Sequence, residues 1–401
     1  MSQEVQESNF KVGAYPFFKD LRKTEPVYPL SKEDGNTTWI VTQYEDVLSL
    51  LKKPSFIKDQ SKLFSQQEED ETPLEVKVFQ NMMLDVDPPD HRRLRKLVQP
   101  HFNPKTIRKL EPRILDIADD LINEMRKKDG PVDLIDDFAF PLPIIVISEL
   151  LGVPVEDRDK FRQWSNTIVS AADNTQEDFA ADINDFIHYL DILFEERQAD
   201  PREDLISKLL QTREEGDLLS NDELYSMIVL LIIAGHETTV NLIGNGMLAL
   251  FEHPEELDKL INDLSLTETA VEECLRYYSP VDFSTARWAE EELTLRGRTI
   301  KRGDLVLASL SSANRDEKKF DNPDEFDITR KPNSHIAFGY GIHFCLGAPL
   351  ARLEGKIAFQ KLLTAFPHIK LAEKRPEWRN MFLLRGLKQL LIKLNTESVT
   401  N

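Results

Sequence analysis

One of the two cysteines stands in a segment whose residue types suit metal ligation. Cys345 closes the run Phe338-Gly-Tyr-Gly-Ile-His-Phe and is followed by Leu-Gly-Ala-Pro349. Pro349 suits the first turn of a helix. A cysteine just before a helix N-terminus meets free backbone N–H groups and the positive end of the helix dipole, which favour its thiolate. Gly339 and Gly341 permit backbone angles and close approach that a side chain would block. A stabilised thiolate beside such glycines, which let a flat group lie close, suits iron ligation.

The pattern F-G-x-G-x-H-x-C-x-G of this segment resembles the haem-binding loop of the cytochrome P450 family at every fixed position. The resemblance implies that Cys345 is the axial thiolate of a haem iron and that His343 reaches a haem propionate. It implies further haem contacts at Phe338, Gly339 and Gly347. The alternative is a cysteine that serves only as a small core residue, and the other segments that match the family weigh against it.

Three more basic residues match propionate-binding positions of the family. His91 and Arg95 are four residues apart in Asp87-Pro-Pro-Asp-His-Arg-Arg-Leu-Arg, so they share one helix face. Arg287, in Ser284-Thr-Ala-Arg-Trp-Ala, matches a further arginine. The two propionate carboxylates of a buried haem need cations as partners, because an unpaired buried charge is strongly destabilising. We therefore expect these three side chains to bind the propionates of haem b.

A long apolar segment carries the second group of candidates. Ser220-Asn-Asp-Glu has the form of a capping box and Pro254 follows the far end, which predicts a helix over 221–252. Residues 227–234 are all apolar, which indicates burial on every side. Polar residues follow this run at once, and a buried helix should not carry them without a role.

The segment that holds these polar residues, Ala234-Gly235-His236-Glu237-Thr238, resembles the oxygen-activating motif A-G-x-[DE]-T of the family. We expect Gly235 to let the helix distort and to leave room for a diatomic molecule, with the Thr238 hydroxyl beside it. Glu237 then relays protons from solvent. The alternative is that Thr238 only bonds a carbonyl one turn earlier. His236 occupies the variable position of the motif, where we expect packing or solvent contact.

The expected substrate pocket is lined by residues before Gly235, by 281–285, by the loop around 60–84, by the 165–185 region and by 381–385. Its candidate side chains are mostly apolar, which predicts an apolar small-molecule substrate: Ile233, Val281, Asp282, Phe283, Met381, Phe382 and Leu383. Asp282 is the exception. It either meets a cationic or hydroxylated substrate or faces solvent.

A dinucleotide site is missing from the sequence. Gly244-x-Gly246-x-x-Ala249 fits G-x-G-x-x-A in letters, but it lies within a predicted helix and follows no strand. The chain resembles stand-alone bacterial haem domains, which implies a ferredoxin or flavodoxin as electron donor, reduced by a separate NAD(P)H reductase. Residues 91–110 hold seven basic residues and no acidic one. Six of them form a candidate docking patch: Arg92, Arg93, Lys96, Lys105, Arg108 and Lys109.

The elements around these residues predict a mainly α protein with small β-sheets, an α+β chain with the cytochrome P450 fold and a single haem domain over 1–401. Helical periodicity covers 44–52, 90–99, 105–128, 143–151, 157–171, 177–199, 203–213, 221–252, 255–263, 268–278 and 348–365. Strand-like pieces are a hairpin around Asp34-Gly35 and the stretches 293–307 and 381–394. Glu273 and Arg276 match the structural E-x-x-R of the family, which Arg330 completes. Cys274 between them is expected to be inert.

Composition limits the partners. The chain has 50 basic and 70 acidic residues among 401 and a net charge of −20. Such a charge repels phosphate backbones and anionic lipids, so we expect neither nucleic acid nor membrane as a partner. The N-terminus does not read as a signal peptide, and two cysteines do not make a disulfide framework. We expect a cytoplasmic protein.

The function these residues predict is a haem-thiolate monooxygenase that inserts one atom of O2 into an apolar small molecule. A peroxide-driven peroxygenase is a close alternative, disfavoured by the intact pair Glu237-Thr238. A haem-thiolate sensor or carrier without turnover belongs to a different class. Composition by itself also leaves open a hydrolase with a cysteine nucleophile, which the absence of haem in the purified protein would favour.

Overall fold

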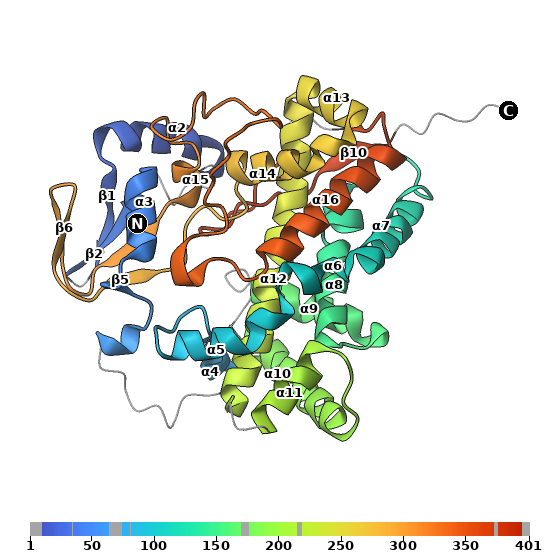
Figure 1. The fold of residues 1–401 in the computed structure, drawn as a ribbon, viewed down its shortest axis with the longest axis horizontal. Coiled ribbons are helices and arrows are strands. Elements are labelled where there is room, and N and C mark those ends of the chain that lie inside the picture. Colours follow the sequence, from blue (N-terminus) through green and yellow to red (C-terminus); the bar gives the residue numbers. More distant parts are fainter. Residues whose placement is uncertain are drawn as a thin grey trace. The chain divides into compact units, whose positions relative to one another are not determined.

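The computed structural model describes residues 10–33, 35–63, 74–80, 82–169, 176–214, 219–372 and 376–394. Most of the chain is helical, with short strands (Figure 1). It divides into two compact units. The first unit comprises residues 1–64, 115–139 and 238–401, and the second comprises 65–114 and 140–237. Among the described residues, the second unit is helical and the strands belong to the first. The predicted class, mainly α with small sheets, is therefore confirmed.

The largest sheet of the first unit has the strand order β1-β2-β8-β5-β3. Its strands are β1 (Val27–Glu33), β2 (Asn36–Val41), β8 (Leu305–Ala308), β5 (Arg287–Ala289) and β3 (Phe56–Ile57). β1 and β2 pair antiparallel and form the predicted hairpin, although Asp34 of its turn lies outside the described residues. β2 pairs parallel with β8, and β5 pairs antiparallel with β8. Arg287 is thus the first residue of a central strand.

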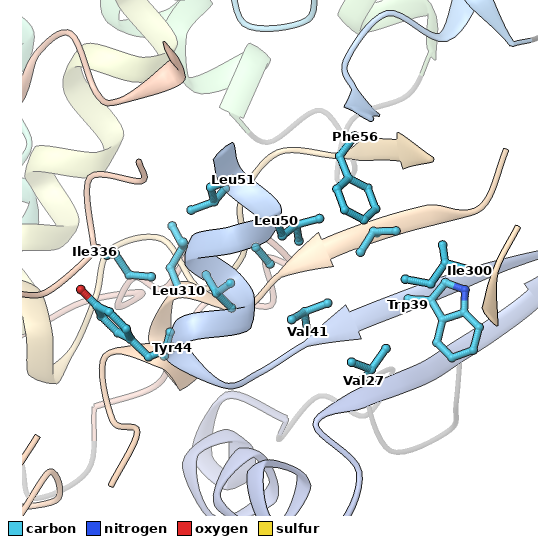
Figure 2. Close-up of a cluster of buried hydrophobic side chains, with 14 of the residues drawn as sticks. Val27, Trp39, Val41, Tyr44, Leu50, Leu51, Phe56, Ile300, Leu310 and Ile336 are labelled. Carbon is cyan, nitrogen blue, oxygen red and sulfur yellow. The ribbon is translucent and has the colours of Figure 1, made fainter. Parts of the chain in front are cut away.

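Helix α3 (Tyr44–Lys52) covers this sheet with an apolar face. Figure 2 shows its Leu50 and Leu51 together with Val41 and Phe56 of the strands, all pointing into one buried cluster. Ile336, from the segment that leads to the cysteine loop, belongs to the same cluster. The Tyr44 hydroxyl also donates to the carbonyl oxygen of Ser334 at 2.7 Å. The sheet and α3 therefore form the base on which that loop rests.

The remaining elements of the first unit are helices and two small sheets. The helices are α2 (Phe10–Thr24), α13 (Pro254–Asn262), α14 (Thr267–Tyr277), α15 (Leu310–Ala313) and α16 (Ala348–Ala365). The small sheets are β4 (Val132–Asp133), β10 (Leu391–Lys393) and β9 (Lys370–Leu371), in the order β4-β10-β9, and the hairpin of β6 (Leu293–Leu295) with β7 (Arg298–Ile300). Helix α16 packs on α14, and Gly355 of α16 lies against Leu242 of α12 (Asn221–Glu252).

The helices of the second unit are α4 (Leu74–Gln80), α5 (Asp90–Val98), α6 (Pro104–Arg108), α8 (Pro141–Leu151), α9 (Arg158–Val169), α10 (Gln176–Ala199) and α11 (Leu205–Glu214). Two helices have residues in both units, α7 (Glu111–Met125) and α12. The predicted capping box of α12 is present: Ser220 N–H donates to Glu223 Oε2 at 2.9 Å, and Glu223 N–H donates to Ser220 Oγ at 3.1 Å. By length and composition α12 could cross a membrane, but 78% of its most apolar window is buried, as in a core helix.

The structure differs from the predicted elements in several places. The single helix expected over 105–128 is two helices, α6 and α7, with a break between Arg108 and Glu111. Helix α2 was not expected, and its sequence contains Pro16 and several aromatic residues, which weaken the helical pattern. In 381–394 only β10 is a regular strand, while isolated bridges join Val281 to Leu384 and Trp378 to Leu387.

Candidate functional site

The loop that carries Cys345 is closed by its own backbone. The Cys345 N–H donates to the Phe338 carbonyl at 2.9 Å, and the Phe344 N–H donates to the Gly341 carbonyl at 3.1 Å. Gly339 and Gly341 have φ of 69° and 78°, in the left-handed region that disfavours side chains. A Cβ on Gly341 would also lie 2.9 Å from the carbonyl oxygen of Leu51, the α3 residue buried beneath the loop. Gly341 is therefore required for two reasons: the left-handed backbone angle and the close approach of the Leu51 carbonyl oxygen.

The Cys345 thiol lies just before the start of α16. This helix begins at Ala348 with Pro349 in its first turn, as expected from the sequence. A Cβ on Gly347 would lie 4.0 Å from the sulfur, so a small residue stands next to it. The thiol is half-buried and forms no disulfide. A thiol donor at a helix N-terminus, next to small residues, is chemically suited to ligate a haem iron.

A charged cluster supports the loop from its side. Arg352 of α16 lies over the Phe338 ring, with 4.5 Å from its guanidinium carbon to the ring centroid. The same guanidinium donates to both oxygens of Glu272 at 2.6 and 2.9 Å, and His335 lies 3.0 Å from Glu272 Oε2. Burial alone would raise the pKa of Glu272, but the hydrogen bonds from Arg352 and His335 outweigh it and lower the pKa to about 2. The carboxylate is therefore charged at neutral pH and orients Arg352.

The predicted propionate-binding residues occur in both units. In the first unit, Arg287 is buried at the start of β5, and His343 is half-buried in the 3-10 turn Gly341–His343 that precedes Cys345. In the second unit, His91 is buried and Arg95 is half-buried one turn later on α5. The spacing predicted a shared helix for His91 and Arg95, and the structure has it. Imidazole and guanidinium groups withdrawn from bulk water in this way fit the carboxylates of a haem.

The side chains of helix α12 become more exposed to solvent at the predicted oxygen motif than in the rest of its middle. Ala234 is exposed, and Ile233, Gly235 and Thr238 are half-buried, within a helix whose other central residues are buried. Glu237 is buried at 1% exposure. The helix runs without a break through Gly235, so the expected distortion there does not interrupt it. The Ala-Gly-Thr face of α12 is therefore the part of its middle that is open to a small molecule.

His236 packs in the core, which confirms the first of the two expectations for it, packing or solvent contact. Its ring is buried and meets the Phe140 ring edge-on, with 4.7 Å between ring centroids. Its Nε2 atom lies 3.9 Å from Glu237 Oε2. The variable position of the motif thus holds a core residue next to the acid.

Glu354 is a candidate that the sequence reasoning missed. It lies on α16, and its side chain is 1% exposed. Burial raises the pKa of Glu354 to about 8, and the nearby hydroxyl of Thr239 lowers it by less. A neutral carboxylic acid therefore stands beside α12, next to the residue that follows Thr238. The signal in the sequence is weak: Glu354 precedes Gly355 and the apolar residues 357–359, but Lys356 lies between them.

The expected pocket residues divide into two groups. Val281, Met381, Phe382, Leu383 and Ile233 are half-buried. Phe283 is fully buried and stacks on the Phe382 ring, with 4.9 Å between centroids and 11° between planes, so it supports Phe382 from behind. Part of the expected lining, 64–73 and 170–175, lies outside the described residues.

Asp282 does not face solvent, so that expectation was wrong. Its side chain is 0% exposed and pairs with Lys11 of α2, at 2.5 Å between Nζ and Oδ2. Its other oxygen accepts from Arg385 Nε at 3.2 Å. Because both oxygens bind cations of the chain, the carboxylate is an internal anchor, a role the sequence did not suggest.

The basic patch is exposed except for one member. Arg92, Lys96, Lys105, Arg108 and Lys109 are exposed on α5, α6 and the residue after α6. Arg93 instead binds the carboxylate of Glu223, the capping-box residue of α12, and lies 3.5 Å from Asp90. Its charge is therefore neutralised locally, which removes it from the set available to a partner.

Known proteins are similar to this chain over nearly its whole length. The family model described as "Cytochrome P450" matches residues 13–394. A protein of Bacillus subtilis (strain 168) named "Cytochrome P450" is 47% identical over 388 residues, covering 96% of this chain and 94% of that protein. The solved structure of the cytochrome P450 PksS of the bacillaene polyketide synthase, from Bacillus subtilis 168, has a TM-score of 0.92 and 42% identity, covering 99% of this chain and 100% of that one. The structure of P450BioI in complex with acyl carrier protein ligated to hexadec-9Z-enoic acid has a TM-score of 0.87 and 39% identity, covering 96% of this chain and 99% of that chain.

Proposed function

The chain belongs to the cytochrome P450 family of haem-dependent monooxygenases, and from that premise we propose that it binds haem b and oxidises an apolar, lipid-like molecule with O2 and electrons from a separate redox protein. The observation that carries the proposal is the Cys345 loop, with its thiol at the N-terminus of α16 and its left-handed glycines. The bound haem supplies the activation of O2.

Specific residues of this chain would hold the haem. Cys345 is the proposed iron ligand, and Phe338, Gly339 and Gly347 of its loop would contact the porphyrin. His343, Arg287, His91 and Arg95 bind the propionates, for which an arginine fork and an imidazole provide charge-assisted hydrogen bonds. Ala234 and Gly235 of α12 are small residues that would leave room for the haem and for O2.

Proton delivery is the proposed task of Glu237 and Thr238. The half-buried Thr238 hydroxyl can donate a hydrogen bond into the open face of α12, and it can accept one from a water molecule. Glu237 is buried next to it and is the proton-carrying group that recharges this hydroxyl. An intact acid and alcohol favour the O2-dependent reaction over a peroxygenase, and they also favour turnover over a sensor.

The substrate class follows from the apolar candidates and from the relatives. PksS belongs by its name to polyketide biosynthesis, and P450BioI was solved with a fatty acyl chain on a carrier protein. Val281, Met381, Phe382, Leu383 and Ile233 are the half-buried residues proposed to contact such a chain. We therefore propose a long acyl or polyketide-like molecule as substrate, and a cytoplasmic location, where carrier proteins and ferredoxins are available.

A ferredoxin or flavodoxin, with an NAD(P)H reductase, is the proposed electron source. The exposed basic residues of α5 and α6 attract an acidic partner. The cysteine loop also exposes three large apolar side chains, Tyr340, Ile342 and Phe344. Exposed apolar groups so near the thiol suit a contact that brings an electron donor close to the iron ligand.

The test is spectroscopic and enzymatic. The purified protein, reduced and exposed to carbon monoxide, should show the absorption band of a thiolate-ligated haem, and Cys345→Ser should lose it. Cys274→Ser, at the buried and inert cysteine, is the matched control. With a ferredoxin and its reductase, NADPH consumption should then accompany oxidation of a fatty-acid substrate. Purified protein without haem would contradict the proposal, and a haem protein that never consumes NADPH with any product would indicate a sensor.

A further inference from the structure

Three segments far apart in the sequence meet at one buried carboxylate. Asp282 receives Lys11 of α2 at 2.5 Å and Arg385 at 3.2 Å, and the side chains of all three are 0 to 5% exposed. Lys11 also donates to the carbonyl oxygen of Phe382 at 3.1 Å. One ammonium group therefore holds both the acid and the backbone of the turn 381–383.

Backbone hydrogen bonds join the same two segments. The N–H of Asp282 donates to the Leu383 carbonyl at 2.8 Å, and the N–H of Arg385 donates to the Pro280 carbonyl at 2.9 Å. This ladder is only a few residues long, and an isolated short pairing is weak by itself. Lys11 and Arg385 add charge-assisted bonds to it. The turn 381–383 therefore depends on the ion cluster for its position.

Helix α2 also contacts the turn through aromatic rings. Phe18 meets Phe283 edge-on at 5.8 Å between centroids, and Phe283 stacks on Phe382 at 4.9 Å. Phe18, Phe283, Leu30, Ile40 and Leu307 form a buried cluster against which Phe382 and Leu383 pack. The position of α2 is thus transmitted to the Phe382 side chain by two routes, a polar one through Lys11 and an apolar one through Phe18.

The ion cluster of Lys11, Asp282 and Arg385 has one more positive charge than negative charge. Two cations share one carboxylate, and Arg385 also lies over the rings of Tyr15 and Trp378, 4.6 and 4.8 Å from its guanidinium carbon to the centroids. Its Nη2 atom has no hydrogen-bond partner within the described ranges. Burial lowers the pKa of Lys11, and the neighbouring Arg385 adds to that effect while Asp282 opposes it. Replacing Lys11 by a neutral residue of similar shape therefore leaves Asp282 paired with Arg385.

We propose that Lys11 is a specificity-determining positioning residue, which fixes the turn 381–383 through Asp282 and the Phe382 carbonyl and so sets the shape of the substrate pocket. The inference rests on the proposed function insofar as Met381, Phe382 and Leu383 contact substrate. The anchoring of the turn by Lys11 is measurable without any substrate.

The experiment compares Lys11→Met with Lys19→Met, at a lysine of the same helix that forms an exposed ion pair with Asp324 at 2.6 Å. Amide hydrogen exchange is measured on the full-length protein as purified, at Asp282, Phe283 and Arg385, without added substrate. Dissociation constants for dodecanoic, tetradecanoic and hexadecanoic acids are measured by their shift of the haem Soret band. Lys11→Gln serves as a second variant if the methionine variant does not fold.

We expect exchange at these amides to speed up about tenfold in the Lys11 variants and to stay within about twofold in Lys19→Met. The relative affinities for the three acids should change in the Lys11 variants only, with haem content unaltered. Unchanged exchange would overturn the anchoring, and faster exchange with unaltered relative affinities would overturn the role in specificity. A wild-type protein without a thiolate-haem spectrum would instead count against the proposed function, and exchange would still decide the anchoring.

Discussion

The guanidinium of Arg276 and the carboxylate of Glu273 face each other across two hydrogen bonds of 2.8 and 2.7 Å, with both side chains fully buried. Arg276 also donates to the carbonyl oxygens of Asn314, Pro323 and Glu325. Glu273 accepts in addition from Arg330 at 3.2 Å and from Asn333 at 3.1 Å. The pair therefore joins α14 to the segment 314–333, which leads into the cysteine loop.

Removing the charge of Glu273 should unfold this connection. Glu273→Gln leaves the buried guanidinium of Arg276 and the half-buried one of Arg330 without this carboxylate, and we expect a loss of about 3 to 5 kcal/mol in the free energy of unfolding. Urea denaturation checks it, together with haem content. Glu268→Gln is the control on the same helix, because its pair with Lys356 is exposed and should change stability by less than about 1 kcal/mol. Equal stability of the two variants would contradict the structural role.

The sequence predicts this network and the cysteine loop for a physical reason. The E-x-x-R spacing places both groups on one helix face, and the loop requires glycines at fixed positions relative to Cys345. Both signals are local, because they depend on neighbours a few residues away. The capping box of α12 and Pro349 at the start of α16 are predictable in the same way.

What the sequence did not predict depends on distant partners. The burial of Asp282 follows from Lys11, which is 271 residues away, and that of Glu354 follows from its position beside α12. Arg93 has the charge of a docking residue, but its partner Glu223 is 130 residues away. The periodicity of the sequence does not predict ion pairs between residues so far apart in the chain. The missed helix α2 has the same origin, because its aromatic face is stabilised by the cluster of Phe283 and Leu307.

Gly341 is predicted to tolerate no side chain. Gly341→Ala forces alanine to a φ of 78° and places its Cβ 2.9 Å from the Leu51 carbonyl oxygen. Gly297→Ala is the matched control, because Gly297 has a φ of 76° but nothing within 4 Å of a Cβ. We expect the control to lose about 1 kcal/mol and Gly341→Ala about 2 to 3 kcal/mol, with weaker haem retention in Gly341→Ala only. Thermal unfolding and the Soret absorbance measure both, and identical losses would argue against the contact with Leu51.

Glu354 should make stability depend on pH. Its pKa is about 8 when folded and 4.5 in its ordinary state, so folding takes up a proton between these values. Below pH 4.5 the carboxyl is neutral in both the folded and the unfolded protein, and folding is not penalised. As pH rises from 4.5 to about 8, the unfolded protein ionises first, and the free energy of unfolding falls by up to about 5 kcal/mol. Urea denaturation at several pH values should show wild type losing stability relative to Glu354→Gln across this window. In Glu124→Gln, at an exposed carboxyl, the difference from wild type should stay flat.

Thr238 should control how electrons are used. Thr238→Ala removes the hydroxyl from the open face of α12, so we expect NADPH oxidation to continue while product per NADPH falls about tenfold and hydrogen peroxide appears. Thr299→Ala, at an exposed position of β7, should keep the wild-type ratio. Product, peroxide and NADPH are measured in the same reaction. Full coupling in Thr238→Ala would favour the alternative in which this hydroxyl only bonds its own helix.

The docking patch should make reduction of the protein sensitive to salt. With a Debye length of about 10 Å at 0.1 M ionic strength, exposed charges attract an acidic partner mainly at low salt. Reduction by a ferredoxin, followed by stopped-flow spectroscopy, should therefore slow several-fold as salt rises, and further in Arg92→Glu and Lys105→Glu. Lys370→Glu, at an exposed lysine on β9, makes the same charge change outside the patch and should have a smaller effect. Equal effects of Arg92→Glu and Lys370→Glu on the reduction rate would mean that net charge alone, and no local surface on α5 and α6, governs the encounter.

Arg93 should behave differently from the exposed members of the patch. Arg93→Gln should lower the stability of the protein more than its reduction rate, because Arg93 holds the α12 capping residue Glu223.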